Sequence, residues 1–464
     1  MIPLTLHQIA QLVGGTLYDA PDPAAMVDRP AVVDSRLAEP GSLFAALAGD
    51  RTDGHRYAVE AVEAGAVAVL AQRPVGVPAV VVPEVLPALA ELARAAAGRL
   101  TDAMVVALTG SAGKTSTKDL LSQLLPALGR TVATPLSYNN QIGLPLTVLR
   151  ADAETRYLLL EMGASQAGDI AWLTGIAPPR VGLVLNIGTA HIGKFGGTKQ
   201  AIAAAKGELV EALPSDGLAV LNADDPYVMS MASRTAARVL TFGRSGGDVR
   251  AGAVELDEAG RPYFTLTDQH GEVAPVRLAL YGAHQVANAT GAAAVALGLG
   301  LPLDEVAELL SKAQPLTPGR MQVLERPDGV TVVNDAFNAN PDSVAVALMA
   351  LAAMAGGRRR TVAVLGEMAE LGEHSGDHHE EVGRLVAAAK VDSLIAVGER
   401  EAELIHRQAR AAGVASMLVA DRVAALEVLR QLLRPGDLVL VKGSHATGLA
   451  ETAEQLCAFP TAVR

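Results

Sequence analysis

The sequence predicts an α/β protein built from three domains. Short apolar runs typical of strands alternate with helical patterns through most of the 464 residues, and this alternation predicts mainly parallel sheets. A phosphate-loop pattern follows one such run near residue 109, and a Pro-rich stretch begins near residue 315. The chain is too long for one ordinary core, so we expect domains over residues 1–100, 101–315 and 316–464.

The composition excludes several classes of protein. The chain is 50% hydrophobic and 19% charged, which predicts a folded globular protein rather than a disordered one. A net charge of −12 argues against a nucleic-acid-binding protein, because such a protein needs a basic face. The one dense basic run, Arg358 to Arg360, is interpreted as a solvated turn.

Cysteine use and hydropathy favour a cytoplasmic protein. The single cysteine, Cys457, excludes an internal disulfide framework, fits a reducing compartment and is expected to pack in the interior. The first residues lack the basic start and long apolar stretch of a signal peptide. The longest apolar run, 344–355, is shorter than the roughly 20 residues of a membrane span, so we expect a buried helix there and no span.

The first 100 residues predict a small α/β domain that has no nucleophile or metal cluster of its own. We expect helices over 5–13, 56–64 and 86–99, and strands over 31–36, 42–47, 66–70 and 79–82. Four polar residues at strand ends or turns are candidate binding groups, with solvated loop residues as an equal alternative: Ser35, Arg36, Asp50 and His55.

The segment from residue 104 predicts a strand, a phosphate loop and a helix. An apolar run over 104–108 precedes Thr109-Gly110-Ser111-Ala112-Gly113, and a helical pattern opens at Lys114. Glycines let the backbone approach a polyphosphate, the N–H groups at the helix start point at it, and Lys114 adds charge. The Thr115 hydroxyl is placed to ligate Mg²⁺. The usual pattern has a glycine where this chain has Leu108, so the loop follows a shorter form, and the expected ligand is a nucleoside triphosphate.

Other expected strands of the same sheet also end in polar residues. Glu161 follows the strand 157–160, and a carboxylate there can share the Mg²⁺ of Thr115. Asn186 and His191 follow the strand 181–185, and a polar loop over 137–143 follows the strand 132–134. Ligands bind at the carboxyl ends of parallel strands, so we expect these groups to meet. Taken alone, His191 is better explained as an ordinary loop histidine.

Lys206 is a single cation in an apolar helical face over 201–208. Burial would lower its pKa and leave a neutral, nucleophilic amine, which could add carbon dioxide to form a carbamate. Such a group would bind a second Mg²⁺. From spacing alone, the favoured interpretation is a lysine whose stem is buried and whose amine reaches solvent.

The residues after the Pro-rich stretch predict a second alternating α/β unit. Its expected strands are 330–334, 361–365, 393–397, 416–419 and 437–441. Polar segments again follow strands, at 335–341, 366–372 and 442–445. His374 and His378 have a helical spacing that could suggest metal, but Ser375 and Gly376 between them favour an exposed loop.

Together these segments resemble the Mur ligase superfamily over essentially the whole chain. The motifs that carry the resemblance are DSR at 34–36, TGSAGKT at 109–115, YNNQIGLPLT at 138–147, LEMGAS at 160–165, NIGTAHIGKFG at 186–196, AKGE at 205–208, GR at 319–320, NDAFNANPDS at 334–343, GEMAELG at 366–372 and KGS at 442–444. Two of them, at 334–343 and 366–372, point to the members that add D-alanyl-D-alanine to UDP-N-acetylmuramoyl-tripeptide.

The resemblance implies an N-terminal UDP-recognition domain, a central ATPase domain and a C-terminal Rossmann-like domain. ATP and Mg²⁺ would be the cofactors, and Lys114, His191 and Lys206 the catalytic groups. The backbone over Gly110, Ser111, Ala112, Gly113, Lys114, Thr115 and Ser116 would hold the β and γ phosphates. Thr115 and Glu161 would bind a first Mg²⁺, and His191 with carbamylated Lys206 a second.

The resemblance also implies further substrate contacts. Asn288 would contact the nucleotide, Arg320 the γ-phosphate and Asp335 the ribose. The UDP-sugar would meet Ser35, Arg36, Asn139 and Asn140, and the peptide or dipeptide would meet Asn338, Asn340, Lys442 and Ser444. The chain departs from the family pattern at Leu136, Ser137, Gln285, Phe337 and His445, which leaves single contacts open but not the class.

The implied reaction is peptide-bond formation in peptidoglycan precursor synthesis. ATP would activate the tripeptide carboxylate as an acyl phosphate, which the amine of D-alanyl-D-alanine would attack. Closure about residues 315–320 would bring the substrates together, and we expect a monomer. Two enzymatic alternatives are another Mur-type amino-acid ligase and a folylpolyglutamate synthase, and a nucleotide-dependent switch protein is the alternative from another class. The pattern leaves open whether the tripeptide carries diaminopimelate or lysine.

Overall fold

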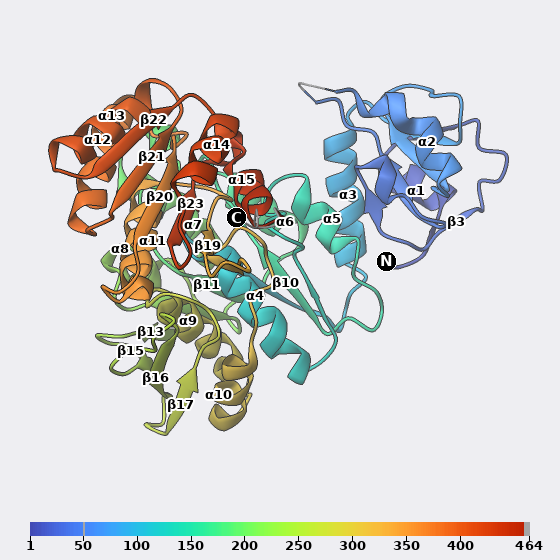
Figure 1. Cartoon of the computed structure of the whole chain (residues 1–464). Helices are drawn as coiled ribbons and strands as arrows, with labels where there is room; N and C mark the ends of the chain where they lie inside the picture. Colours follow the sequence, from blue (N-terminus) through green and yellow to red (C-terminus); the bar gives the residue numbers. More distant parts are fainter. Residues whose placement is uncertain (50–51, 459–464) are drawn as a thin grey trace.

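The computed structural model describes residues 1–49 and 52–458, so the candidate residue Asp50 lies outside the described part of the chain. Three groups of strands follow one another along the sequence, and Figure 1 shows them as three lobes. The predicted α/β class with three domains is confirmed by this architecture. The described residues include no helix that is long and apolar enough to cross a membrane.

The N-terminal lobe contains a five-stranded sheet in the order β2-β7-β6-β5-β4 and a separate two-stranded one. The strands are β1 (Leu4–Thr5), β2 (Thr16–Tyr18), β3 (Met26–Val27), β4 (Ala31–Val32), β5 (Leu43–Ala45), β6 (Ala68–Ala71) and β7 (Ala79–Val81). The helices are α1 (Leu6–Leu12), α2 (Ala58–Glu63) and α3 (Val85–Ala97), as predicted within a few residues. Thr5 caps α1 in a capping box with Gln8.

The central lobe is organised around a ten-stranded sheet in the order β15-β16-β14-β13-β12-β11-β8-β10-β9, with β17 beside β16. Its strands are β8 (Met104–Thr109), β9 (Thr131–Ala133), β10 (Tyr157–Glu161), β11 (Val181–Val184), β12 (Leu218–Asn222), β13 (Arg238–Gly243), β14 (Val249–Ala251), β15 (Glu255–Leu256), β16 (Pro262–Thr267) and β17 (Val273–Arg277). The part from β9 to β14 is parallel, as predicted, whereas β15, β16 and β17 add an antiparallel extension that we did not predict.

Helices cover both faces of the central sheet. They are α4 (Lys114–Leu124), α5 (Gly143–Val148), α6 (Asp169–Ile176), α7 (Lys199–Glu211), α8 (Pro226–Met229), α9 (Gln285–Gly298) and α10 (Leu303–Lys312). α4 and α9 pack together beside the phosphate loop, and α9 is apolar almost all round because it lies within the core. α10 instead buries one face, including Val306 and Leu310.

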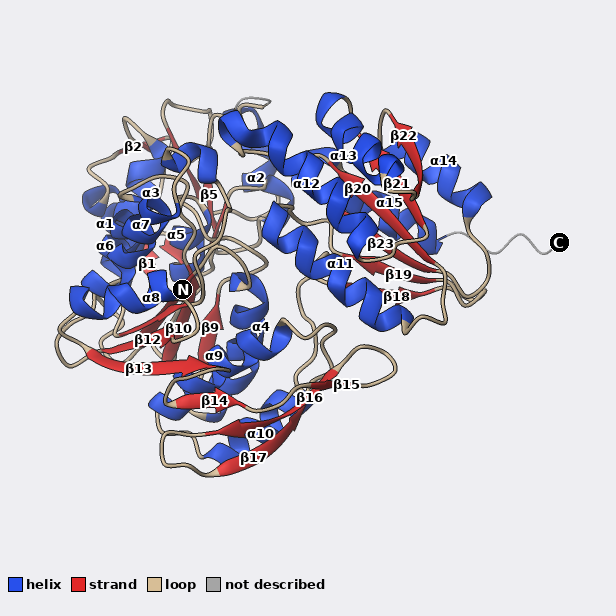
Figure 2. Ribbon diagram, turned by 90° about the vertical axis from the view of Figure 1, so that its left-hand side faces the viewer, coloured by secondary structure: helices blue, strands red, loops and turns tan. Residues whose placement is uncertain are grey.

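The C-terminal lobe contains a six-stranded sheet in the order β18-β19-β23-β20-β21-β22. Its strands are β18 (Gln322–Glu325), β19 (Thr331–Asn334), β20 (Thr361–Gly366), β21 (Ser393–Val397), β22 (Ala415–Val419) and β23 (Leu438–Lys442). α11 (Pro341–Ala355), α12 (Ser375–Ala388) and α13 (Arg400–Ala411) cover one face, and α14 (Arg422–Leu432) and α15 (Leu449–Ala458) cover the other (Figure 2). All five predicted strands are present, and the apolar run at 344–355 lies in α11, as predicted.

Two local predictions in this lobe are wrong. His378 lies in helix α12 rather than in a loop, because the packing of α12 against α13 outweighs the weak helix propensity of Gly376. The adjacent His379 is buried, and its Nε2 accepts the Met368 N–H at 2.9 Å. The basic run is not simply solvated either, since Arg360 pairs with Asp437 at 2.5 Å.

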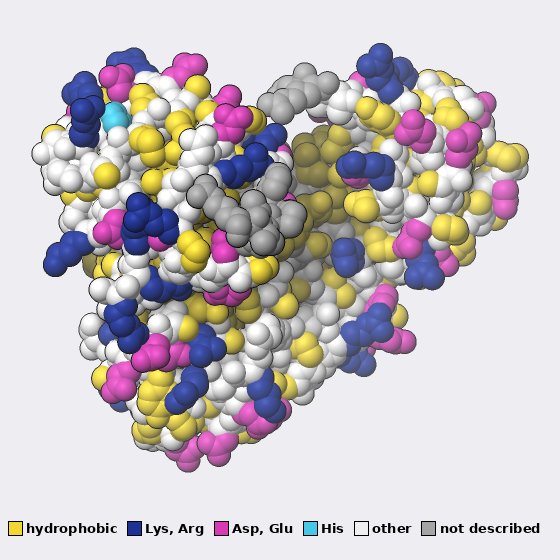
Figure 3. Space-filling model, viewed as in Figure 1, with side chains coloured by type: hydrophobic (Ala, Val, Ile, Leu, Met, Phe, Trp, Pro, Cys, Tyr) yellow, Lys and Arg dark blue, Asp and Glu magenta, His cyan; other side chains and the backbone are white. Residues whose placement is uncertain are grey.

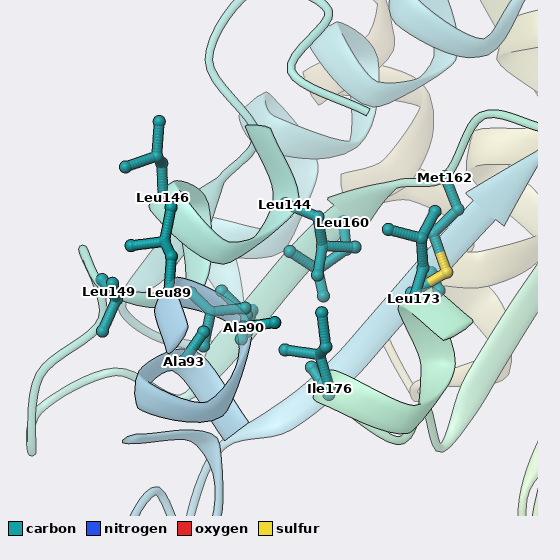
Figure 4. Close-up of a cluster of buried hydrophobic side chains, with 14 of the residues drawn as sticks. Leu89, Ala90, Ala93, Leu144, Leu146, Leu149, Leu160, Met162, Leu173 and Ile176 are labelled. Atoms are coloured by element: carbon teal, nitrogen blue, oxygen red, sulfur yellow. The ribbon is translucent and has the colours of Figure 1, made fainter. Parts of the chain in front are cut away.

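The N-terminal and central lobes share a continuous apolar core. Residues of α3 pack against α5 and α6, as Figure 4 shows for Leu89, Leu144 and Ile176. Arg94 Nε also donates to the carbonyl oxygen of Gly175 at 2.9 Å. Above this contact the surface is hollowed between the N-terminal and C-terminal lobes, with hydrophobic side chains on its floor (Figure 3).

The connection between the central and C-terminal lobes is anchored at its start. The Asp119 carboxylate in α4 accepts the Thr317 N–H at 3.0 Å and the Thr317 hydroxyl at 3.1 Å. Gly319 and Met321, which follow, both have positive φ, +70° and +51°. The connection between the anchored Thr317 and β18 therefore spans only residues 318–321.

Candidate functional site

The phosphate loop lies at the carboxyl end of β8, between β10 and β11. Gly113 precedes α4 with a left-handed φ of +81°. A Cβ on Gly113 would lie 2.2 Å from Asn288 Oδ1, and one on Gly110 would lie 2.9 Å from Leu185 Cβ. Both positions therefore need glycine, and the loop leaves the first N–H groups of α4 facing outward for an anion.

Asn186 holds the phosphate loop in shape. Its Oδ1 accepts the Ala112 N–H at 2.9 Å, and its Nδ2 donates to the Ala112 carbonyl oxygen at 3.0 Å. The Ser111 N–H donates to the Asn186 carbonyl oxygen at 3.0 Å. The sequence placed Asn186 at a strand end but did not indicate this role, because the loop partner lies 74 positions away.

Lys114 Nζ donates to the Gly110 carbonyl oxygen at 2.8 Å, across the top of the loop. Burial lowers the pKa of this amine, the Glu161 carboxylate opposes that shift, and the Arg320 guanidinium adds to it. Glu161 and Arg320 both hydrogen bond to the hydroxyl of Thr115, the residue after Lys114, so the three charged groups lie at one end of the phosphate loop.

Glu161 is a buried carboxylate at the end of β10. Its Oε1 accepts from Asn139 Nδ2 at 2.7 Å, from the Ser137 hydroxyl at 3.3 Å and from the Thr115 hydroxyl at 3.4 Å. Its Oε2 is buried and has no hydrogen-bond partner among the described residues. Asn139, for which the sequence predicts a sugar contact, donates to this carboxylate through Nδ2, and Ser137 joins the same group. Asn140 uses its Oδ1 to accept from the backbone N–H of Ile142 and Gly143.

His191 lies in the loop after β11 and has a left-handed φ of +60°. Its Nδ1 hydrogen bonds to the Glu370 carboxylate of the C-terminal lobe, and Lys194 Nζ pairs with the same carboxylate at 2.5 Å. Burial is the main cause that lowers the pKa of His191, with smaller contributions from Lys114 and Lys206, while Glu370 raises it. α7, which carries Lys206, packs against both β8 and the turn Ile192–Phe195 that follows His191, so the three residues lie on neighbouring elements.

Lys206 lies in α7 and is only 2% exposed. Burial, and secondarily the charge of Lys114, lowers the pKa of its amine well below the ordinary value. The burial contradicts the interpretation of a lysine whose amine reaches solvent, and the lowered pKa shifts the amine toward its neutral form.

Arg320 connects the hinge to the phosphate loop. Its Nη2 donates to the Thr115 hydroxyl at 3.2 Å, and its guanidinium lies 4.1 Å above the centre of the Phe337 ring. Phe337 in turn stacks on His445, with ring centres 6.0 Å apart. Two departures from the family pattern thus form a stack that orients Arg320.

Asp335 and Lys442 pair with each other beneath the loop 335–340. Lys442 Nζ contacts Asp335 Oδ2 at 2.7 Å and the Asn338 carbonyl oxygen at 2.9 Å, and Asp335 Oδ1 accepts the Met321 N–H at 3.0 Å. Asn340 caps α11 through its side chain, while Asn338 is exposed. Ser444 donates to the Glu367 carbonyl oxygen at 2.8 Å. Lys442, Asn340 and Ser444 thus support the loops around the site.

The remaining predicted residues lie in two places, with Asn288 in the central lobe and Ser35, Arg36 and His55 in the N-terminal lobe. Asn288 is buried beside the phosphate loop and donates to Gln285 Oε1 at 2.9 Å. Ser35 is buried at the start of a short helix, whereas Arg36 is exposed and pairs with Asp34 at 2.6 Å. Among the contacts of the described residues, none joins Ser35 or Arg36 to Asn139 or Asn140. His55 is structural, because its ring accepts the Gln72 N–H and contacts Asp53.

A surface depression of the C-terminal lobe lies elsewhere and is not this site. It has a volume of about 610 Å³ at the opposite end of the C-terminal sheet and is lined by Arg358, Arg359, Arg360 and Arg434 among others. Arg359 and Arg360 are engaged there by the carbonyl oxygen and the carboxylate of Asp437.

The burial of His284 should make the stability of the fold depend on pH. Burial lowers its pKa to about 4, and the positive charge of Lys442 adds to this shift while Asp335 opposes it. The folded state then binds fewer protons than the unfolded state between pH 4 and 6.5, so stability should fall as pH drops through that window. The loss should be on the order of 2 kcal/mol. Thermal unfolding of wild type and His284→Gln between pH 7.5 and 4.5 measures it, and an equal decline of Tm in both proteins would contradict the assignment.

Comparisons with known proteins give the same family for the whole chain. Family models match in sequence order: "Mur ligase family, catalytic domain" at residues 32–107, "Mur ligase middle domain" at 108–296 and "Mur ligase, glutamate ligase domain" at 319–445. The curated UDP-N-acetylmuramoyl-tripeptide--D-alanyl-D-alanine ligase of Mycobacterium tuberculosis is 48% identical, with 99% of each chain covered. The Escherichia coli protein of the same name is 35% identical over 98% of this chain and 99% of its own.

Solved structures agree with these relatives. The crystal structure of MurF from Acinetobacter baumannii matches with a TM-score of 0.85 at 30% identity, covering 98% of this chain and 99% of that one. MurF ligase from Thermotoga maritima in complex with ADP matches with a TM-score of 0.78 at 32% identity, covering 93% and 97%. The chain therefore belongs to the Mur ligase family.

Proposed function

We propose that this protein is an ATP-dependent ligase that joins the terminal carboxylate of UDP-N-acetylmuramoyl-tripeptide to the amine of D-alanyl-D-alanine. This reaction extends a peptidoglycan precursor. The observation that supports it most is a phosphate loop beside the buried Glu161 carboxylate, with His191 and the buried Lys206 on adjoining elements, in a chain 48% identical to ligases of that name. A nucleotide switch would need no such second group of ligands.

The proposal divides the work among three domains. Residues 1–100 would recognise the UDP-sugar, 101–315 would bind ATP, and 316–464 would present D-alanyl-D-alanine. Ser35, Arg36, Asn139 and Asn140 remain the proposed UDP-sugar contacts, and Asn338, Asn340, Lys442 and Ser444 the proposed peptide contacts. The hollow between the outer lobes provides room for an extended substrate (Figure 3).

The residues around the phosphate loop fit ATP. Ser111 Oγ and Arg320 Nε are buried without a partner among the described residues, so polar atoms remain available to a bound anion. The N–H groups from Gly110 to Ser116 would receive the β and γ phosphates, with Lys114 and Arg320 offsetting their charge. Asn288 and Asp335 would contact the nucleoside.

The same region fits Mg²⁺. Glu161 Oε2 has no partner among the described residues, and the Thr115 hydroxyl hydrogen bonds to the other oxygen of the same carboxylate. A carboxylate and a hydroxyl supply the hard oxygen ligands that Mg²⁺ prefers. Thr115 and Glu161 would hold one ion, and His191 with carbamylated Lys206 a second. When bound, Mg²⁺ would offset the charge of the transferring phosphoryl group.

The carbamate would form on the neutral amine of Lys206. Its lone pair attacks the carbon of CO₂, an N–C bond forms, and one proton leaves to solvent. A buried neutral amine thereby becomes a buried anion, which suits a position where burial and the positive charge of Lys114 both disfavour an ammonium group.

The chain's residues would then carry out ligation in two steps. Lys114 and Arg320 hold the γ-phosphoryl group in line with the tripeptide carboxylate, whose oxygen bonds to phosphorus as ADP leaves. The neutral amine of D-alanyl-D-alanine attacks the resulting acyl phosphate, and the tetrahedral intermediate collapses to an amide as phosphate leaves and the amine proton is lost. Closure of the C-terminal lobe excludes water, which would otherwise hydrolyse the acyl phosphate.

Phosphate release tests the proposed reaction. With ATP, Mg²⁺ and UDP-N-acetylmuramoyl-tripeptide, we expect release to require D-alanyl-D-alanine and not to respond to D-glutamate, L-lysine or diaminopimelate. A response to a single amino acid would favour another Mur-type ligase, and ATP consumption without any acceptor would favour a switch. Tripeptides that carry diaminopimelate or lysine, compared by kcat/KM, would settle the third residue.

We also propose that the protein is a monomer and that it is located in the cytoplasm. The single cysteine, Cys457, is partly buried beside the core of the C-terminal lobe, so it has a packing role. Light scattering after size-exclusion chromatography measures the mass in solution.

A further inference from the structure

The loop that carries His191 is held by the C-terminal lobe. We call residues 186–196 the His191 loop. Its Thr189 donates from both its backbone N–H and its hydroxyl to Asp342 Oδ2, each at 2.7 Å. His191 and Lys194 both contact the Glu370 carboxylate. Two carboxylates of the C-terminal lobe thus hold one loop of the central lobe at four points.

The backbones of the two lobes also approach closely beside these contacts. The Gly193 N–H donates to the Glu370 carbonyl oxygen at 3.2 Å. A Cβ on Gly193 would lie 2.4 Å from Gly372 N, and a Cβ on Gly372 would lie 2.8 Å from Gly193 Cα. Only glycine permits this approach from either side, so the contact is a specific fit between the lobes rather than a loose surface encounter.

The backbone on both sides of the contact is strained. His191 has a φ of +60° and Glu370 a φ of +64°, a region that side chains other than glycine seldom occupy. Such conformations persist where surrounding contacts impose them. Here His191 and Glu370 contact each other across the two lobes, so each lobe holds the strained backbone of the other in place when they meet.

We propose that Glu370 and Asp342 are positioning residues that hold the His191 loop in its metal-binding shape only when the C-terminal lobe is closed on the central lobe. Glu370 engages His191 Nδ1, which leaves Nε2 free for a ligand and sets the plane of the ring. Asp342 holds the start of the loop beside Gly188, whose Cβ would lie 2.6 Å from Asp342 Oδ2. The second metal site would thus be completed only after closure has enclosed the substrates.

This inference rests on the proposed metal site, and metal binding tests it directly. Mn²⁺ titrations of the complex with the non-hydrolysable analogue AMP-PNP, followed by electron paramagnetic resonance, should give two bound ions for wild type. Glu370→Ala should weaken the second ion by about 10-fold to 100-fold and leave the first unchanged. Glu370→Gln keeps a hydrogen-bond acceptor for His191 Nδ1, so it should bind the second ion almost as tightly as wild type. Glu373→Ala, at a nearby exposed carboxylate, is the matched control.

The outcomes separate the inference from the function on which it depends. One bound ion in wild type would contradict the second metal site itself. Two ions in wild type and unchanged binding in Glu370→Ala would overturn only the positioning role. Turnover adds a second readout: Glu370→Ala and Asp342→Ala should lower kcat with little change in the KM for ATP, and a rise in KM alone would count against positioning.

A steric probe tests the requirement for closure without touching a polar group. Gly193→Ala places a methyl group against Gly372 but imposes no backbone strain of its own, because φ at Gly193 is not positive. With AMP-PNP and Mg²⁺, small-angle X-ray scattering should show a larger radius of gyration for this variant than for wild type, and the second Mn²⁺ should bind weakly. Gly175→Ala, whose Cβ would meet no atom within 4 Å, should behave as wild type. A Gly193→Ala protein as compact as wild type, with two tightly bound ions, would overturn the inference.

Discussion

Lys114→Ala should abolish ligation, with kcat reduced by about 10³-fold or more. The amine lies across the phosphate loop, 2.8 Å from the Gly110 carbonyl oxygen, where it can exchange that partner for a phosphate oxygen. The next lysine of α4, Lys118, is buried and pairs with Asp119, so it is not free to replace the charge of Lys114. A single-turnover measurement with saturating ATP separates the chemical steps of ligation from product release.

Two variants accompany Lys114→Ala. Lys312→Ala removes an exposed lysine that pairs only with Glu308 one turn earlier, and it should keep full activity. Lys114→Arg keeps a charge but changes its geometry, and it should recover only part of the rate. Near-normal turnover of a folded Lys114→Ala protein would refute the assignment of this loop as the ATP site.

Lys206→Ala should lower kcat by about 10²-fold or more, because it removes the proposed carboxylate ligand of the second Mg²⁺. Short carboxylic acids such as formate or acetate should restore part of the rate, since they can enter the space left by the side chain and supply the missing anion. The dependence of kcat on acid concentration, measured at constant ionic strength with sodium chloride as the comparison, is the required readout.

The control for this experiment lies in the same helix. Lys199→Ala changes the lysine at the first position of α7, and it should neither lose the rate substantially nor respond to added acid. The activity of wild type should also fall under CO₂-free conditions, and added bicarbonate should reverse this fall. A Lys206→Ala protein that no carboxylic acid rescues, with a correct fold by circular dichroism, would count against the carbamate.

Local chemistry made the phosphate loop predictable. Gly110, Gly113, Lys114 and Thr115 lie within six positions of one another, and the backbone geometry that they require follows from their own φ preferences. The strand ends were also predictable, because carboxyl ends of parallel strands share one edge of the sheet. Glu161 and His191 accordingly lie around the same space as the loop. The family resemblance itself is confirmed by the comparisons.

Contacts between distant segments could not be predicted in this way. Asn186 meets Ala112 across 74 positions, and Glu370 meets His191 across 179. No local pattern encodes such pairs, because the sheet order and the placement of one lobe on another create them. The same holds for Asn139, which lies on Glu161, and for Phe337, which stacks between Arg320 and His445.

Secondary structure was misjudged where packing outweighs local preference. Ser375 and Gly376 favour a turn, yet α12 begins there because its apolar face is buried against α13. The strands β15, β16 and β17 extend a parallel sheet with antiparallel hairpins, which the alternation of strands and helices did not indicate. In β16 the buried residues Phe264 and Leu266 alternate with exposed ones, a period that identifies a half-covered strand.

The sequence by itself determined the class of the protein, the phosphate loop and the identity of the groups that could act there. The tertiary structure alone decided the state of those groups. Lys206 has the same side chain as any helical lysine, and only its burial at 2% exposure, with the charge of Lys114 as a second cause, lowers the pKa of its amine well below the ordinary value. The physical reason is that a pKa depends on solvation and on charges brought close by folding, neither of which is a property of neighbouring positions in the chain.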